Sequence, residues 1–85
     1  MKLLFTKTFV RDYRRLPQEI QKVVDKQIQT LFSNPNHPSL HLKKMRDPRD
    51  IWEGRVNQSY RFTFQIIRDT YVLRKVGTHD ILRKP

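Results

Sequence analysis

The sequence predicts an α+β fold in which a helical hairpin packs on a four-stranded sheet of antiparallel type, in the order β–α–α–β–β–β. Three observations predict it. Apolar residues recur at the helical period over 9–32, they alternate at the strand period over 51–77, and a short apolar run occupies 2–6. A chain of 85 residues has room for one domain, residues 1–85, with one modest core.

Composition limits the classes of function. Lys and Arg total 18 against 8 Asp and Glu, a formal net charge of +10. This field attracts polyanions, so nucleic acid is the leading expected partner; an acidic protein or an anionic membrane surface would satisfy the same field. The chain has no cysteine, which excludes disulfides, a thiolate nucleophile and a cysteine-based zinc site. The run "MKLLF" is too short for a signal peptide or a membrane span, so we expect a cytoplasmic domain.

Two helices are expected after the strand over 2–6. Thr8 is the expected N-cap of a helix over 9–16, whose apolar stripe includes Phe9 and Tyr13. Pro17 suits the first turn of a second helix, because a missing N–H costs nothing there. The apolar stripe of this second helix consists of Ile20, Val23, Val24, Ile28, Leu31 and Phe32. Prolines in "SNPNHP" forbid its continuation, so the two helices should form a hairpin.

The segment 33–50 holds three of the five prolines and shows no clear period. We expect an ordered loop anchored by Leu40, Leu42 and Met45. His37 and His41 are expected to point to solvent, as are the basic residues of the loop. Although the two histidines are four residues apart, Pro38 breaks the helix that would align them, so no metal site is predicted.

Three strands are expected over 51–57, 59–67 and 70–77, with Arg68–Asp69 as a tight connection between the last two. In the last strand neither alternating set is wholly apolar. Periodicity does not determine which neighbour the strand over 2–6 joins.

The register of the first two of these strands follows from their alternation. Tyr60, Phe62, Phe64 and Ile66 share one face. A three-residue loop over 57–59 sets Trp52 opposite Phe64, Glu53 opposite Thr63 and Arg55 opposite Arg61. A slip by one residue would bury the arginines, so the pattern specifies the register. We therefore expect the helices to cover the aromatic face and the cationic face to stay open.

Two directly opposed cations repel each other. One interpretation is a surface ion pair of Arg61 with Glu53, which contributes about 0–1 kcal/mol. The other is a pair of guanidinium groups that binds a phosphate, since the guanidinium fork matches phosphate oxygens. The strand over 70–77 leads into "GTHD" and can bring His79 near the arginines. His79 is either a surface or capping residue or the proton-transfer group that phosphodiester chemistry needs near neutrality.

Four segments together resemble the RelE/ParE toxin superfamily of bacterial toxin–antitoxin systems. They are "RDYRRLPQEIQKVV", "NPNHPSLHLKKM", "IWEGRVNQSYRFTF" and "VGTHD". The resemblance implies a RelE-like fold and a ribosome-dependent mRNA endonuclease that inhibits translation. In such enzymes the 2′-hydroxyl of a codon in the ribosomal A site attacks the adjacent phosphate, without a metal or other cofactor.

The resemblance also implies roles for individual residues. Arg61 resembles the phosphate-stabilising arginine of the family, His79 the C-terminal acid/base residue, and Arg55 a supporting cation. Glu53 lies near the position where some members place their base. The basic residues expected to contact ribosomal RNA are Arg11, Arg14, Arg15, Lys43, Lys44, Arg46, Arg83 and Lys84.

The partners implied are a cognate antitoxin, acidic in the segment that wraps this chain, together with the ribosome and its mRNA; no membrane or metal partner is implied. Two alternatives remain open from the sequence. One is a ParE-like inhibitor of DNA gyrase, which shares the fold but lacks a ribonuclease site. The other is a member that binds without cleaving.

Overall fold

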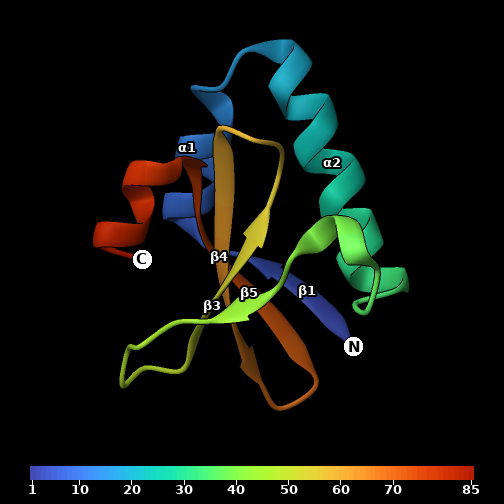
Figure 1. The fold of residues 1–85 in the computed structure, drawn as a ribbon, viewed down its shortest axis with the longest axis vertical. Helices are drawn as coiled ribbons and strands as arrows, with labels where there is room; N and C mark the ends of the chain where they lie inside the picture. The colour runs from blue at the N-terminus through green and yellow to red at the C-terminus, as the bar shows by residue number, and fades with distance from the viewer.

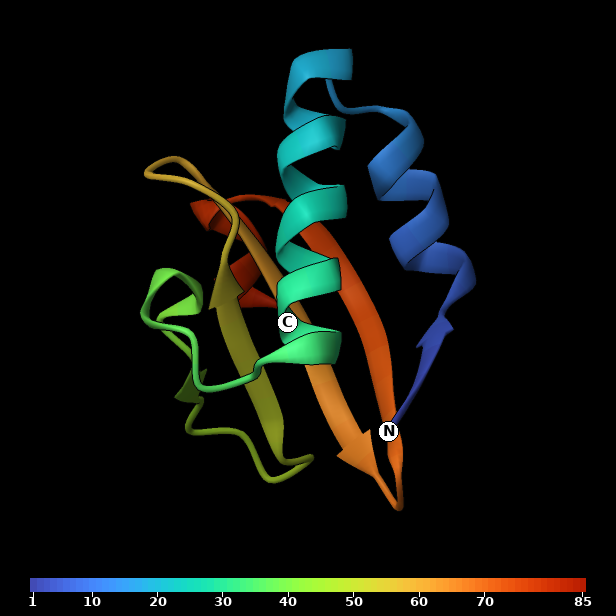
Figure 2. The same ribbon diagram turned by 90° about the vertical axis from the view of Figure 1, so that its right-hand side faces the viewer.

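The computed structural model describes residues 1–85 as one mixed sheet with two helices (Figures 1 and 2). The sheet has five strands in the order β1-β5-β4-β3-β2. The strands are β1 (Lys2–Phe5), β2 (Lys43–Lys44), β3 (Ile51–Arg55), β4 (Tyr60–Ile67) and β5 (Thr70–Thr78). The helices are α1 (Lys7–Arg14) and α2 (Gln18–Ser33). The two 3₁₀ turns are η1 (Pro38–Leu40) and η2 (His79–Arg83). The predicted α+β fold is therefore confirmed, with one additional strand. No helix combines the length and the apolar character that a membrane span requires.

Two features of the sheet differ from the expected four antiparallel strands. β1 runs parallel to β5, with Leu3 opposite Tyr71, and so forms one edge of the sheet. β2 pairs antiparallel with β3 inside the segment expected to be a loop, with Lys43 opposite Glu53. A strand of two residues is too short to show alternation, which is why the sequence pattern did not reveal it.

The helices begin at different residues from those expected. Thr6, not Thr8, is the N-cap of α1, because its Oγ1 accepts a hydrogen bond from the Phe9 amide at 3.1 Å. The same hydroxyl donates to the Arg74 carbonyl, also at 3.1 Å, so the cap fastens α1 to β5. Pro17 is the N-cap of α2 rather than a residue of its first turn.

A β-bulge explains the irregular alternation of β5. Thr63 pairs with Lys75 and Phe64 pairs with Leu73, which leaves Arg74 without a partner on β4. A bulge residue shifts the alternation of the strand by one. Leu73 before the bulge and Val76 after it are both buried in the core, although two residues three positions apart would point to opposite faces of a regular strand.

The core lies between the aromatic face of the sheet and the helices. α2 crosses this face and α1 lies next to β5 (Figure 2). The buried cluster consists of Phe9, Val24, Ile28, Leu31, Leu40, Val56, Phe62, Phe64, Tyr71, Leu73 and Val76. The ring centroids of Phe62 and Phe64 lie 5.8 Å apart, and those of Phe64 and Tyr71 lie 5.7 Å apart. The expected coverage of the aromatic face is therefore confirmed for Phe62 and Phe64, whereas Ile66 of the same face is 47% exposed.

One polar side chain in the core joins three elements. Gln27 of α2 is buried, and its Nε2 donates to the Arg55 carbonyl at 2.8 Å and to the Ser39 carbonyl at 3.3 Å. The buried amide of Gln27 needs such partners, because an unpaired polar group in the core costs about 1–3 kcal/mol. Gln27 therefore fixes the end of β3 and the turn η1 against α2.

Candidate active site

The two arginines stand directly opposite each other on β3 and β4. The pairing is Trp52 with Phe64, Glu53 with Thr63, and Arg55 with Arg61. This is the register that the alternation predicts. A three-residue connection follows Val56, whose amide donates to the Tyr60 carbonyl at 3.0 Å.

A pocket of about 320 Å³ lies over this arginine pair, and we call it the cationic pocket. No apolar side chain lines it. Its lining residues are His41, Lys43, Glu53, Arg55, Arg61 and His79. The four residues expected from the sequence to form a catalytic site thus line one pocket. Lys43, expected to contact RNA, lines it as well.

Arg61 is held in place by the turn that precedes it. Its Nη1 donates to the carbonyl of Asn57 at 2.6 Å, of Gln58 at 3.2 Å and of Tyr60 at 3.0 Å. The turn itself is fixed by Asn57, whose Oδ1 accepts from the Ser59 and Tyr60 amides, each at 2.9 Å. The Nε and Nη2 of Arg61 make no hydrogen bond within the chain. The guanidinium is therefore oriented by one nitrogen and can donate to an anion through the others.

The side chain of Arg55 makes no hydrogen bond or ion pair within the chain. Its Nε is buried and makes no hydrogen bond within the protein. A buried donor without an acceptor is unfavourable, and an anion bound in the cationic pocket would supply one.

Glu53 does not form the ion pair with Arg61 that was one interpretation of the sequence. The three ion pairs in the chain are Arg11–Asp12, Lys44–Asp50 and Arg49–Asp47, and all lie outside the cationic pocket. Three cations face one carboxylate in the pocket, so the pocket retains a net positive charge that favours an anionic ligand.

The C-terminal turn places His79 in the pocket. η2 follows β5 directly and lies on the side of the sheet away from α2 (Figure 1). Gly77, opposite Arg61, allows this close approach, since a Cβ there would lie 2.9 Å from Ile81 Cγ2. The expectation of a fully open cationic face is corrected: Thr63 is completely buried, and its Oγ1 donates to the Pro85 carbonyl at 3.2 Å. The turn and the residues after it cover the middle of this face and leave the arginine end accessible.

Five of the other basic residues expected to bind RNA line two depressions outside the pocket: Arg11, Arg14, Arg15, Arg83 and Lys84. Arg11 of α1 shares a shallow surface depression with Arg83 and Lys84. A second depression along α1 is lined by Lys7, Arg11, Arg14 and Arg15, together with apolar residues. Lys44 is paired with Asp50 at 3.1 Å, and Arg46 is exposed.

In the same loop, two hydrogen bonds and the positive charge of Arg49 lower the pKa of Asp47 to about 2, which stabilises the loop before β3.

His41 is a pocket residue that the sequence did not reveal. His41 is exposed, as expected from the sequence, and it also lines the cationic pocket. His37, its neighbour in the loop, instead caps η1: its Nδ1 accepts from the Ser39 amide at 3.1 Å. No periodicity distinguishes the two histidines, because His41 follows a proline-containing 3₁₀ turn.

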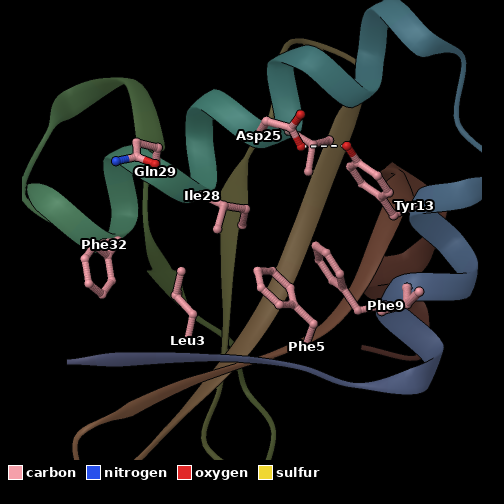
Figure 3. Close-up of a pocket in the computed structure, with 10 residues that line it drawn as sticks. Leu3, Phe5, Phe9, Tyr13, Asp25, Ile28, Gln29 and Phe32 are labelled. Atoms are coloured by element: carbon pink, nitrogen blue, oxygen red, sulfur yellow. Dashed lines mark hydrogen bonds between the residues drawn. The ribbon is translucent and has the colours of Figure 1, made fainter.

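An apolar groove lies on the opposite side of the molecule, between β1, α1 and α2 (Figure 3). Its volume is about 510 Å³, and eight of its ten lining residues are hydrophobic. Phe5 and Phe32 on its rim are 46% and 47% exposed. Tyr13 donates to Asp25 Oδ1 at 2.7 Å across the groove, and this hydrogen bond raises the pKa of the tyrosine hydroxyl. An open apolar groove of this kind is typical of a surface that a partner covers.

Comparisons with known proteins give a consistent result. No protein-family model matches the chain. The protein Toxin RelE3 of Methanocaldococcus jannaschii is 32% identical over 78 residues, which cover 89% of this chain and 88% of that protein. In the crystal structure of the RelB-RelE antitoxin-toxin complex from Methanococcus jannaschii, one chain is 25% identical with a TM-score of 0.76, over 94% of each chain. The crystal structure of YafQ from E. coli has a TM-score of 0.79 at 10% identity, over 95% of this chain and 96% of that chain; this last likeness concerns the fold alone.

Proposed function

The chain belongs to the RelE family of toxins of toxin–antitoxin systems, and from that premise we propose that it is a ribosome-dependent mRNA endonuclease controlled by a cognate antitoxin. The observation that carries the proposal is the cationic pocket, in which an opposed pair of arginines and two imidazoles surround a space without apolar lining. Such a space suits a phosphodiester of RNA.

In the proposed reaction the 2′-hydroxyl of one nucleotide attacks the adjacent phosphate. Negative charge builds up on the phosphate oxygens as the new bond forms. Arg61 stabilises that charge from a fixed position, because its Nη1 is anchored on the turn carbonyls. Arg55 contributes a second guanidinium, whose buried Nε gains its missing acceptor. His79 protonates the departing 5′-oxygen.

The ribosome supplies the substrate in the required conformation. The basic surface of α1 and the neighbouring Arg83 and Lys84 suit contacts with the phosphates of ribosomal RNA. Such contacts release counterions, so we expect association with ribosomes to weaken steeply as the salt concentration rises.

Purified ribosomes programmed with a defined mRNA test the proposal. With the wild-type chain we expect a cut within the A-site codon, mapped by primer extension, and no cut in the same mRNA without ribosomes. Absence of cleavage, together with inhibition of supercoiling by purified gyrase, would instead favour the ParE-like function. Absence of both activities would indicate a member that only binds.

For the antitoxin we propose the apolar groove as the docking surface. The chain carries a large net positive charge, so its partner should be acidic, and the open groove requires apolar side chains to fill it. An acidic segment with an apolar stripe meets both requirements. The expected source is the protein encoded by the neighbouring reading frame.

Replacing Phe32 by glutamine is expected to weaken antitoxin binding by about tenfold or more, because large aromatic side chains at interfaces contribute most of the affinity. Isothermal titration calorimetry with the purified antitoxin measures the loss. Ile67→Gln is the matched control, since Ile67 is 51% exposed and lies outside the groove. Equal affinities of both variants and the wild type would show that the antitoxin binds elsewhere.

A further inference from the structure

His41 lines the cationic pocket but has no part in the reaction as described so far. We propose that His41 is the general base that takes the proton from the attacking 2′-hydroxyl, while His79 is the general acid. The inference rests on the proposed endonuclease function, and it adds a catalytic residue outside the strands and the C-terminal motif.

The backbone fixes where His41 lies. The residue follows η1, whose Leu40 is completely buried and whose Ser39 carbonyl accepts from Gln27. The His41 amide donates to the Pro38 carbonyl at 3.3 Å. Its backbone is left-handed, with φ 44° and ψ 48°, a conformation that few residues other than glycine adopt, although histidine is among those enriched there. Such a conformation persists where the surroundings determine it, and it is frequent at functional sites.

The side chain is free to act on a ligand. Among the six pocket residues, Lys43, Arg55 and Arg61 can only donate protons or hydrogen bonds. The ring of His41 makes no hydrogen bond within the chain, whereas the ring of His37 is occupied in capping η1. The pocket thus contains two imidazoles without protein partners beside two guanidinium groups. This is the set of groups that an acid–base cleavage of a phosphodiester requires.

Besides the two imidazoles, Glu53 is the group in the pocket that can accept a proton. It stands opposite Lys43 on β2 and next to the arginine pair, so three cations line the pocket with its carboxylate, although none forms an ion pair with it. In this position its charge offsets part of their mutual repulsion. The arrangement therefore favours His41 as the base and Glu53 as a group that positions the cations.

The step balances without a co-reactant. The proton of the 2′-hydroxyl moves to the imidazole of His41, and the 2′-oxygen forms a bond to phosphorus. The bond from phosphorus to the 5′-oxygen breaks, and the imidazolium of His79 gives its proton to that oxygen. The products are a 2′,3′-cyclic phosphate and a free 5′-hydroxyl. Exchange of one proton with water at each ring restores both histidines.

The variants His41→Asn and His37→Asn test the inference. Asparagine tolerates the left-handed conformation at 41 and can cap a turn at 37, so both variants should melt at about the wild-type temperature. Under single-turnover conditions on programmed ribosomes, His41→Asn should cleave about 10²-fold more slowly or worse, which is the usual contribution of a general base. His37→Asn should cleave at the wild-type rate.

Two further readouts separate a base from a residue that merely shapes the pocket. In a plot of cleavage rate against pH, the wild-type rate should rise on the acidic side as the base loses its proton. This acidic limb should be flat in His41→Asn. Added imidazole should restore part of the rate to His41→Gly and none to Arg61→Ala.

The outcomes distinguish the inference from the function on which it rests. A wild-type rate for His41→Asn, with Arg61→Ala inactive, would overturn the role of His41 and leave the endonuclease in place. The role of His41 would also be overturned if His41→Asn cleaved slowly but kept the acidic limb of the pH–rate profile, and imidazole did not rescue His41→Gly. Loss of the acidic limb in Glu53→Gln alone would overturn it as well. Unchanged cleavage in both Arg61→Ala and His79→Ala would overturn the proposed catalytic pocket itself.

Discussion

Replacing Arg61 by alanine is expected to slow cleavage of ribosome-bound mRNA by about 10²- to 10³-fold, the usual cost of removing one preorganised donor from a developing oxyanion. The structure gives a specific reason for so large an effect. Three turn carbonyls hold Nη1 of Arg61, so the guanidinium does not have to be ordered when the substrate arrives. Single-turnover cleavage on programmed ribosomes, followed by primer extension, measures the rate.

Two further variants show whether the loss comes from geometry or from charge. Arg61→Lys keeps the positive charge but has no planar fork, so it should recover only a small part of the rate. Arg68→Asn removes an arginine from the β4–β5 turn, where the backbone is left-handed (φ 57°) and asparagine is tolerated, and it should cleave normally. If Arg68→Asn slowed cleavage as much as Arg61→Ala, net charge would explain the effect and the pocket would not.

The arginine pair could be predicted from the sequence because two independent constraints agree. The alternation of β4 requires Phe62 and Phe64 to face the core, and the three-residue connection at 57–59 then fixes Arg61 opposite Arg55. The approach of His79 could be expected from chain connectivity alone, since only one residue separates it from Gly77.

The remaining parts of the pocket and the fold depend on contacts that no local pattern encodes. His41 enters the pocket through a left-handed backbone after η1, and its neighbours in sequence have no period from which a face could be read. The coverage of Thr63 depends on a hydrogen bond to Pro85, 22 residues away. The parallel pairing of β1 with β5 likewise joins the first and last strands of the chain, and alternation within a strand does not identify its neighbour.

Replacing Gly54 by alanine is expected to lower the stability of the fold more than any other substitution that adds one methyl group. Gly54 lies between Glu53 and Arg55 on β3, opposite Phe62. A Cβ at this position would lie 2.2, 2.5 and 2.8 Å from three carbons of the Phe62 ring. That ring is completely buried and packs against Phe64, so it has no space into which to move. Forcing a methyl group into a packed core costs about 1–3 kcal/mol and sometimes more, and we expect the upper end.

Thermal denaturation followed by circular dichroism measures the loss, which should exceed about 10 °C for a domain of this size. Gly77→Ala is the matched control: its added methyl group meets only Ile81 Cγ2, at 2.9 Å, and a partly exposed turn can shift to accommodate it. Phe62→Leu should lower stability alone but relieve the clash in the double variant, so the two changes should be strongly non-additive. Additive losses would show that the ring does not occupy the space above Gly54.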